Sequence, residues 1–261
     1  MFLNDKNALG FISSPMQLQD ILYSQGFGTR RVCAGLVQHG WVEVREASGY
    51  RRAEDSTEQL ALEGLQLKVQ GVEWACHAKA YVMLHKPAGF ECSQKPSAHP
   101  SIYTLLPAPL RQRPSKSAVQ GVQAVGRLDQ DTTGLLLMSD DGQFIHRLSS
   151  PKKHVPKVYR VQLKHAMGAA QVEQLLAGVV LDDDPKPVKA AACVLLDAQT
   201  MDLTLTEGKY HQVKRMVAAV GNRVEGLHRW RIGTLDLPED LAPGQWKWLA
   251  AEDLARIGVV L

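Results

Sequence analysis

From residue 80 onward, short apolar runs of strand length alternate with polar loops and a few helical segments, and this order limits the folds open to the chain. Strands are expected at 80–86, 135–138, 158–163, 191–196, 202–206 and 232–235, and helices at 171–176 and 211–220. Such runs, bounded by turn residues, are typical of strands. We therefore predict an α+β fold for residues 80–261, built on a mixed, largely antiparallel sheet.

A smaller unit is expected before this domain, over residues 16–77. Its elements are helices at 16–25 and 29–39, followed by strands at 41–44 and 65–69. Leu18, Ile21 and Leu22 fall on one face of the first helix, as the period of an amphipathic helix requires. Thr29 can cap the second helix, and Gly40 can end it. These elements predict a small N-terminal α/β module made of a helix-turn-helix and short strands.

Two further segments lie outside these regular elements. Residues 1–15 are expected to form a short N-terminal extension. Residues 94–120 are rich in proline, serine and glutamine, and we expect them to form a long surface loop. The sequence assigns no role to the later part of this loop, residues 107–120.

The composition is that of an ordinary globular protein. Of the 261 residues, 45% are hydrophobic, which is enough for a core, and 22% are charged, which argues against disorder. No apolar run reaches the roughly 18 residues that a membrane helix needs, and the N-terminus lacks the layout of a signal peptide. The four cysteines contain no C-x-x-C pair, so we expect no metal site and a reducing compartment. We therefore expect a cytoplasmic protein with no membrane partner.

Basic residues are concentrated in two stretches, although the formal net charge is only +3. Residues 143–172 contain six Lys or Arg and no Asp or Glu, and residues 208–232 contain six basic residues and one acid, Glu225. Basic residues separated from acids indicate a one-sided positive surface of the kind that binds phosphates. Two solvated faces would give the same pattern, so charge alone leaves both interpretations open.

The segment GRLDQDTTGLLL, residues 126–137, places a polar loop directly before a strongly apolar strand. A carboxylate at the start of a buried strand is partly desolvated and held in place, which suits a nucleophile or a base. Asp129 is therefore a candidate catalytic residue. Asp-rich turns before strands are also common in proteins where they have no catalytic role, so this segment alone does not decide.

Two later segments contain further candidates. In KVYRV, residues 157–161, Lys157, Tyr159 and Val161 share one face of an expected strand. Tyr159 can stack on a nucleobase or relay a proton, or it can be a half-buried strand residue with no such role. In EGKYHQVKRM, residues 207–216, basic residues occur at the start of a helix. A cation there can pair with a neighbouring carboxylate, or face RNA or water.

Taken together, these segments resemble the pseudouridine synthases, and within them the ribosomal small-subunit branch. GRLDQDTTGLLL matches the family's catalytic motif, KVYRV its tyrosine motif and EGKYHQVKRM its third motif. Lys86-Pro87 with Gly89 matches the family's lead-in strand, which comes before the catalytic motif in the chain. Residues 140–143, 220–222 and 227–229 are most similar to the synthases that modify uridine 516 of 16S rRNA. Residues 16–77 resemble the ribosomal-protein-S-four-type RNA-binding module. The resemblance extends over nearly the whole chain.

The resemblance implies an isomerase that converts a uridine within RNA to pseudouridine, without a cofactor or a metal. Asp129 falls on the family's catalytic aspartate, which attacks the sugar or abstracts a sugar proton, and the sequence does not choose between these. Tyr159 falls on a tyrosine that packs on the target base. Lys214 falls on the basic residue that pairs with the aspartate and keeps it ionised. Arg127 corresponds to a residue that fills the gap left by the flipped base.

The same resemblance implies ribosomal RNA as the partner, most closely 16S rRNA or a small-subunit assembly intermediate, bound by a monomer. RNA-binding residues are expected at Arg127, Arg30, Arg31, Lys157, Arg215 and Arg229. Two other functions stay open: a sister synthase acting on 23S rRNA or tRNA, and a non-catalytic RNA-binding factor in ribosome assembly. The presence of Asp129, Tyr159 and Lys214 together argues against the second of these.

Overall fold

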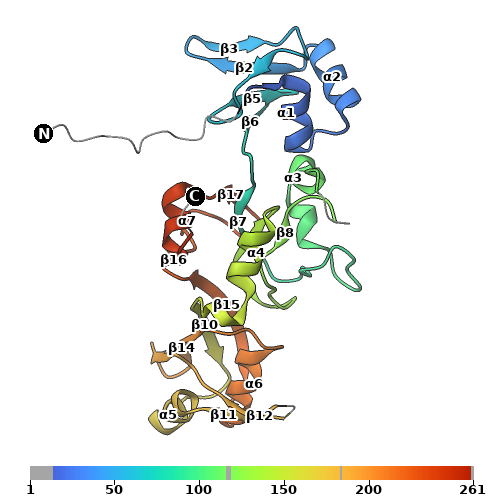
Figure 1. The fold of residues 1–261 in the computed structure, drawn as a ribbon. Coiled ribbons are helices and arrows are strands. Elements are labelled where there is room, and N and C mark those ends of the chain that lie inside the picture. Colours follow the sequence, from blue (N-terminus) through green and yellow to red (C-terminus); the bar gives the residue numbers. More distant parts are fainter. Residues whose placement is uncertain (1–13, 116–118, 183, 260–261) are drawn as a thin grey trace, which may run out of the picture. The chain divides into compact units, whose positions relative to one another are not determined.

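The computed structural model describes residues 14–115, 119–182 and 184–259, and contacts divide the chain into two units (Figure 1). The first unit extends to Ala80 and also includes Pro107–Val122. The second unit comprises Tyr81–Leu106 and the chain from Gln123 onward. The expected extension, residues 1–15, lies outside the described residues except for Ser14 and Pro15.

The part of the first unit before Ala80 contains two helices, which are followed by a four-stranded antiparallel sheet. The helices are α1 (Leu18–Gln25) and α2 (Arg30–Gln38). The sheet has the order β3-β2-β5-β6, with β2 at Val42–Glu46, β3 at Gly49–Arg52, β5 at Gln66–Val69 and β6 at Val72–Ala75. Thr29 caps α2 as predicted, because its hydroxyl accepts a hydrogen bond from the backbone N–H of Val32.

The first helix begins two residues later than its hydrophobic pattern predicts. Met16 and Gln17 form a short strand, β1 (Met16–Gln17), which pairs with β4 (Gln59–Leu60). The backbone hydrogen bonds of this pair replace those of the first helical turn. Leu18, Ile21 and Leu22 are fully buried, so the predicted apolar face is confirmed.

The expectation that residues 94–120 form one long surface loop is wrong. This segment contains the short 3-10 helix η1 (Ile102–Leu105) and the helix α3 (Ala108–Gln112). Arg113 is 2% exposed, and its guanidinium donates to Gln25 Oε1 at 3.0 Å and to the carbonyl of His77 at 2.8 Å. The part after Pro107 is therefore built into the first unit. Single helical turns are too short to produce a periodic pattern, which is why the composition misled the prediction.

The second unit is built on a nine-stranded sheet in the order β13-β14-β10-β15-β9-β7-β17, with β8 paired to β9 and β16 paired to β15. The strands are β7 (Tyr81–Lys86), β8 (Gln123–Ala124), β9 (Thr133–Ser139), β10 (Lys157–Leu163), β13 (Ala192–Leu195), β14 (Thr200–Leu205), β15 (Val224–Ile232), β16 (Leu235–Asp236) and β17 (Trp246–Trp248). β15 and β9 pair in parallel, and the other pairs are antiparallel. The predicted α+β fold with a mixed, largely antiparallel sheet is confirmed.

Helices and one small hairpin complete the second unit. They are α4 (Gly142–Ser149), η2 (Pro151–Lys153), α5 (Ala169–Ala177), α6 (Gln212–Ala219) and α7 (Ala251–Arg256), with β11 (Val179–Leu181) paired to β12 (Asp184–Val188). Phe144 and Leu148 of α4 and Leu254 of α7 belong to the same core cluster as Leu135 and Leu137 of β9. The apolar strand after the polar loop is thus buried as expected. Across the described ranges, every helix is too short or too polar to span a bilayer.

The longest strand, β15, is where the strand prediction is wrong. The pattern predicts a strand only at 232–235, whereas β15 begins at Val224. Residues 224–231 include two arginines, a histidine and a glutamate, so their composition does not look like that of a central strand. Both edges of β15 are nevertheless paired, with β10 on one side and β9 on the other, and the backbone hydrogen bonds stabilise it. This strand brings Arg229 next to β9 and β10.

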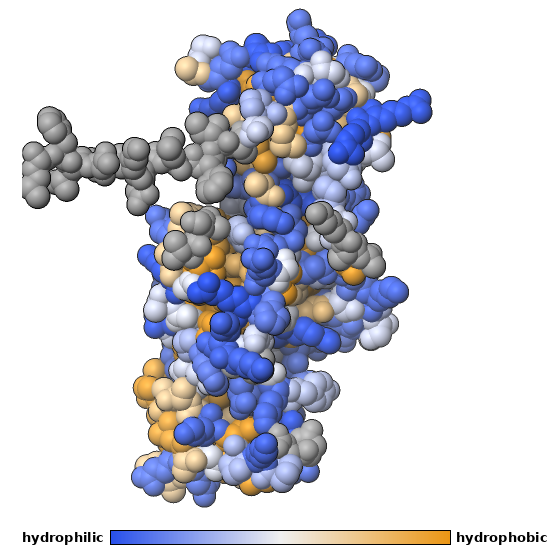
Figure 2. All heavy atoms as spheres, in the orientation of Figure 1, coloured by the Kyte–Doolittle hydropathy of each residue, from blue (hydrophilic) through white to orange (hydrophobic). Residues whose placement is uncertain are grey.

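Apolar side chains are also exposed at one end of the second unit, over the part that carries α5, β13 and β14 (Figure 2). Val180 is 58% exposed, Val194 55% and Leu196 49%. β13 is an edge strand of the sheet, and Val194 lies on it. This end of the unit therefore combines an edge strand with exposed apolar residues.

Candidate active site

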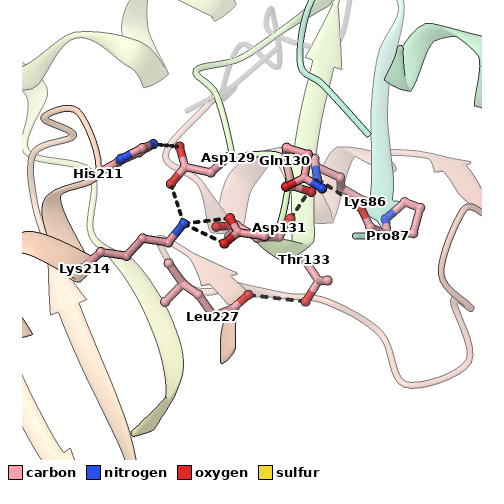
Figure 3. Close-up of polar contacts among 10 residues, drawn as sticks. Lys86, Pro87, Asp129, Gln130, Asp131, Thr133, His211, Lys214 and Leu227 are labelled. Carbon is pink, nitrogen blue, oxygen red and sulfur yellow. Dashed lines mark hydrogen bonds and ion pairs between the residues drawn. The ribbon is translucent and has the colours of Figure 1, made fainter. Parts of the chain in front are cut away.

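The loop before β9 is held in shape by Lys86, the last residue of β7. Lys86 is fully buried, and its ammonium donates to the carbonyls of Pro87 at 3.0 Å, Gln130 at 3.1 Å and Thr132 at 2.8 Å (Figure 3). Burial lowers the pKa of Lys86, and the three carbonyl dipoles stabilise its charged form. These contacts fix the backbone on both sides of Asp131 and thereby the loop that carries Asp129.

The Asp129 carboxylate has a nitrogen group beside each of its oxygens. Oδ2 lies 3.4 Å from Lys214 Nζ, and Oδ1 lies 3.4 Å from His211 Nε2 (Figure 3). The side chain of Asp129 is 30% exposed, so it stays accessible. The expected proximity of Lys214 to Asp129 is confirmed by this distance.

Lys214 is paired still more closely with Asp131. Its Nζ lies 2.7 Å from Oδ1 and 2.9 Å from Oδ2 of that carboxylate. Burial raises the pKa of Asp131, but the hydrogen bond and the charge of Lys214 outweigh burial and lower it. Burial lowers the pKa of Lys214, and the Asp131 hydrogen bond and both carboxylate charges more than reverse this. Asp131 was not among the predicted residues, although its place two residues after Asp129 could have indicated a shared cation.

His211 adopts a left-handed backbone conformation, with φ at +48°, directly before α6. Its ring stacks on Tyr210 with centroids 3.8 Å apart. A non-glycine residue in this region is uncommon, and such strain is concentrated at functional sites. His211 was not among the residues predicted from the sequence, although it lies inside the EGKYHQVKRM segment. A histidine directly before a basic helix was the signal that could have found it.

Tyr159 of β10 and Arg229 of β15 are partners across the sheet. Tyr159 is 9% exposed, and Arg229 Cζ lies 5.9 Å from the centroid of its ring. Arg229 is 2% exposed, and its Nε donates to the carbonyl of Leu135 at 2.9 Å.

On β9, Gly134 has φ at +109°, and a Cβ there would lie 2.2 Å from the carbonyl oxygen of Arg229. Glycine alone allows β9 and β15 to approach so closely.

A cavity of about 400 Å³ in the second unit collects most of the expected site residues. It is lined by Asp129, Tyr159 and Lys214 and also by Arg127, Lys157 and Arg229. This volume lies in the ordinary range of small-ligand sites. Burial, and then the positive charge of Arg229, lower the pKa of Lys157 to about 8. Lys157 and Arg229 therefore face an interior site rather than an open surface.

The other three expected RNA-binding residues are not among those that line this cavity. Arg30 and Arg31 are exposed at the start of α2 in the first unit. Arg30 forms an ion pair with Asp20 at 2.5 Å and lies over the ring of Tyr23. Arg215 in α6 donates to the carbonyl of Tyr210 at 3.2 Å. The structure thus brings together three of the six expected RNA-binding residues, at the cavity.

Comparison with known proteins gives a consistent set of relatives. Residues 80–219 match the family model described as RNA pseudouridylate synthase. A protein of Vibrio vulnificus named ribosomal small subunit pseudouridine synthase A is 37% identical over 244 residues, which is 93% of this chain and 99% of the relative. A protein of Yersinia pestis with the same name is 44% identical over 178 residues, covering 68% of this chain and 72% of the relative.

A solved structure gives the same result for the fold. The crystal structure of a pseudouridylate synthase superposes with a TM-score of 0.63 at 32% identity, covering 93% of this chain and 99% of that chain. The matched family segment contains Asp129, Tyr159 and Lys214, the three residues selected from the sequence motifs. The chain therefore belongs to the RNA pseudouridylate synthase family.

Proposed function

We propose that this enzyme converts a uridine of 16S rRNA to pseudouridine, with Asp129 as the group that acts on the ribose. The observation that carries the proposal is the Asp129 carboxylate at the cavity, with Lys214 Nζ and His211 Nε2 each 3.4 Å from one oxygen. Attack and proton abstraction both need an ionised carboxylate, and Lys214 places a positive charge beside that of Asp129. The names of the Vibrio vulnificus and Yersinia pestis relatives support small-subunit RNA as the substrate.

The reaction breaks the bond from ribose C1′ to uracil N1 and forms a bond from C1′ to C5. If Asp129 attacks C1′, a carboxylate ester forms while uracil leaves with the N1 electron pair. The base then turns, C5 displaces the carboxylate, and the proton lost from C5 is balanced by one gained at N1. If Asp129 instead takes a sugar proton, it returns that proton when the new bond forms. Neither route changes the net oxidation state of the substrate.

Side chains around the cavity can hold the target nucleotide in an extruded position. Taking a base out of its stack costs a few kcal/mol. The ring of Tyr159 offers a surface on which the uracil can pack, and Arg127 can fill the space that the base leaves. Phosphate contacts by Lys157, Arg215 and Arg229 can offset the cost of extrusion.

We assign substrate binding also to the N-terminal module, residues 16–77, through Arg30 and Arg31. Residues 80–261 then perform the chemistry, and the enzyme acts as a monomer. A substrate of the small ribosomal subunit favours a cytoplasmic location, where that subunit is assembled. This division of labour agrees with the resemblance of residues 16–77 to the ribosomal-protein-S-four-type module.

Pseudouridine maps of ribosomal RNA from cells with and without this protein test the proposal. We expect one site to disappear from 16S rRNA, with uridine 516 as the first position to inspect, and to return with wild-type protein but not with Asp129→Asn. Loss of a site in 23S rRNA or tRNA would favour a sister synthase. An unchanged map, with impaired small-subunit assembly, would favour a non-catalytic assembly factor. Purified enzyme offered free 16S rRNA or small-subunit precursors then identifies the substrate form.

A further inference from the structure

Cationic side chains outnumber carboxylates around the cavity. The cations that line it are Arg127, Lys157, Lys209, Lys214 and Arg229, and the carboxylates among the described residues are Asp129 and Glu207. Both carboxylates have partners, because Asp129 lies beside Lys214 and His211, and Glu207 accepts a hydrogen bond from Gln212 at 2.9 Å. Within the described part of the chain, Lys157 and Arg229 therefore face the cavity without a carboxylate partner.

Arg229 also has an unused hydrogen-bond donor. Its Nε is satisfied by the carbonyl of Leu135, but its Nη2 is buried and has no partner among the described residues. Leaving a buried donor unpaired costs free energy, and the cost is higher for a charged group. A folded protein tolerates such a cost where a ligand supplies the missing acceptor.

Lys157, on the neighbouring strand β10, likewise has no carboxylate partner among the described residues. Its ammonium donates to the carbonyl of Val155 at 3.0 Å, which is a neutral acceptor. Burial and the charge of Arg229 lower its pKa to about 8, so the two cations destabilise one another. A neutral uracil oxygen would satisfy the donors but leave this repulsion, whereas an anion would remove both penalties.

We propose that Lys157 and Arg229 form a phosphate subsite that receives a phosphodiester group next to the target uridine. Arg229 lies opposite Tyr159 across the sheet, and Lys157 lies on the same strand as Tyr159, two residues before it. An anion held by both cations is therefore beside the ring assigned to the target base. The inference rests on the proposed function, since it requires RNA in the cavity, and adds that the phosphate bound by these two residues is one next to the target uridine.

Neutralising single phosphates of the RNA tests the subsite directly. A 16S rRNA fragment is prepared with one methylphosphonate linkage, placed 5′ or 3′ of the target uridine or several nucleotides away. Affinity is measured by fluorescence anisotropy. We expect one of the two flanking substitutions to weaken binding by about tenfold to a hundredfold, as the loss of a charge-assisted hydrogen bond would. Flanking substitutions no more harmful than the distant one would overturn the subsite.

Protein variants show whether Lys157 and Arg229 are the residues responsible. In Arg229→Gln and in Lys157→Met, the same methylphosphonate should lose most of its effect, because the partner of the phosphate is already gone. Lys189→Met is the matched control, since Lys189 is an exposed lysine outside the cavity, and it should keep the full effect. Lys157→Met is informative even if Arg229→Gln does not fold. An undiminished effect in Lys157→Met would reject the assignment.

The pH dependence of binding gives a second readout. Free wild-type enzyme loses the Lys157 proton as the pH rises through about 8, and bound phosphate raises that pKa, so affinity should fall above this pH. Lys157→Arg keeps its charge and should remove the fall. Tyr159, Tyr210 and His211, with the cations and carboxylates named above, are the other titratable groups of the cavity, and Lys157→Arg does not alter them. Equal pH dependence in both proteins would contradict the subsite.

These tests separate the subsite from the proposed function. An active enzyme that is insensitive to methylphosphonate overturns the subsite and leaves the function intact. A wild-type enzyme that forms no pseudouridine in any ribosomal RNA overturns the function, whatever the phosphate measurements give.

Discussion

At the scale of single residues, the contacts of Asp129 lead to the first prediction. Asp129→Asn keeps the shape of the side chain but removes the carboxylate that either route requires. We expect pseudouridine formation to disappear, as measured by tritium release from uridine labelled at C5, while affinity for RNA and thermal stability stay close to wild type. Activity within tenfold of wild type would contradict the assignment of Asp129.

A second prediction separates the imidazole of His211 from its backbone conformation. Asparagine tolerates positive φ but is too short to reach Asp129, whereas alanine adopts this conformation at a cost. His211→Asn and His211→Ala should both slow the single-turnover rate at saturating RNA, by about tenfold for a lost charge-assisted contact. His211→Ala alone should also lower the free energy of unfolding in urea, by about 1 kcal/mol. A full rate in His211→Asn would show that the imidazole has no part in the reaction.

The sequence motifs located the catalytic candidates but not the residues that support them. Asp129, Tyr159 and Lys214 could be selected because each lies in a recognisable segment. The contacts of Lys86 could not be predicted from the sequence. Its ammonium binds the carbonyls of Gln130 and Thr132, which lie 44 and 46 residues further along the chain. A contact of this kind depends on strand pairing that no local pattern specifies.

At the scale of elements, the close approach of β9 and β15 gives a third prediction. In Gly134→Ala, the new methyl group would clash with the carbonyl of Arg229, and the residue would keep an unfavourable φ. We expect a loss of about 2–4 kcal/mol in the free energy of unfolding. Urea unfolding of the isolated protein measures it.

Gly142→Ala is the matched control for this substitution. Gly142 begins α4, and a Cβ there meets nothing within 4 Å. Because alanine favours helix over glycine, this variant should be as stable as wild type or more stable by about 0.5–1 kcal/mol. Similar losses in the two variants would show that the contact between β9 and β15 is not the cause.

Long strands with many apolar residues were predicted from the sequence, and the one with few was not. β9 has the run Leu135–Leu137 and was found, because a buried strand with apolar neighbours gives a strong local signal. β15 was found only at its end, because Arg229, Arg231 and His228 hide a strand whose stability comes from pairing on both edges. The strand that was missed is also the one that carries Arg229 to the cavity.

At the scale of the whole molecule, the proposed division of labour between the units gives a fourth prediction. Each neutralised phosphate contributes about 0.7 to the slope of log affinity against log salt for single-stranded RNA. Replacing Arg30 and Arg31 with alanine should weaken RNA binding and flatten this slope. Arg30 is already paired with Asp20, so we expect Arg31→Ala alone to account for most of the change. The maximal rate at saturating RNA should change little.

The control for this experiment is Lys189→Met, which removes an exposed charge from the second unit. It should leave both affinity and salt slope close to wild type. If the double arginine variant also leaves them unchanged, the second unit binds the RNA without the first.

The chain passes between its two units three times, at 80–81, 106–107 and 122–123. A proteolytic cut at 80–81 would release residues 1–80 as a separate polypeptide, whereas residues 107–122 of the same unit would stay covalently joined to the second unit. Deleting the first 80 residues would expose Arg113 without Gln25, its buried partner. The N-terminal module therefore cannot be exchanged by replacing residues 1–80 alone. A chimera between relatives must replace residues 1–80 and 107–122 together.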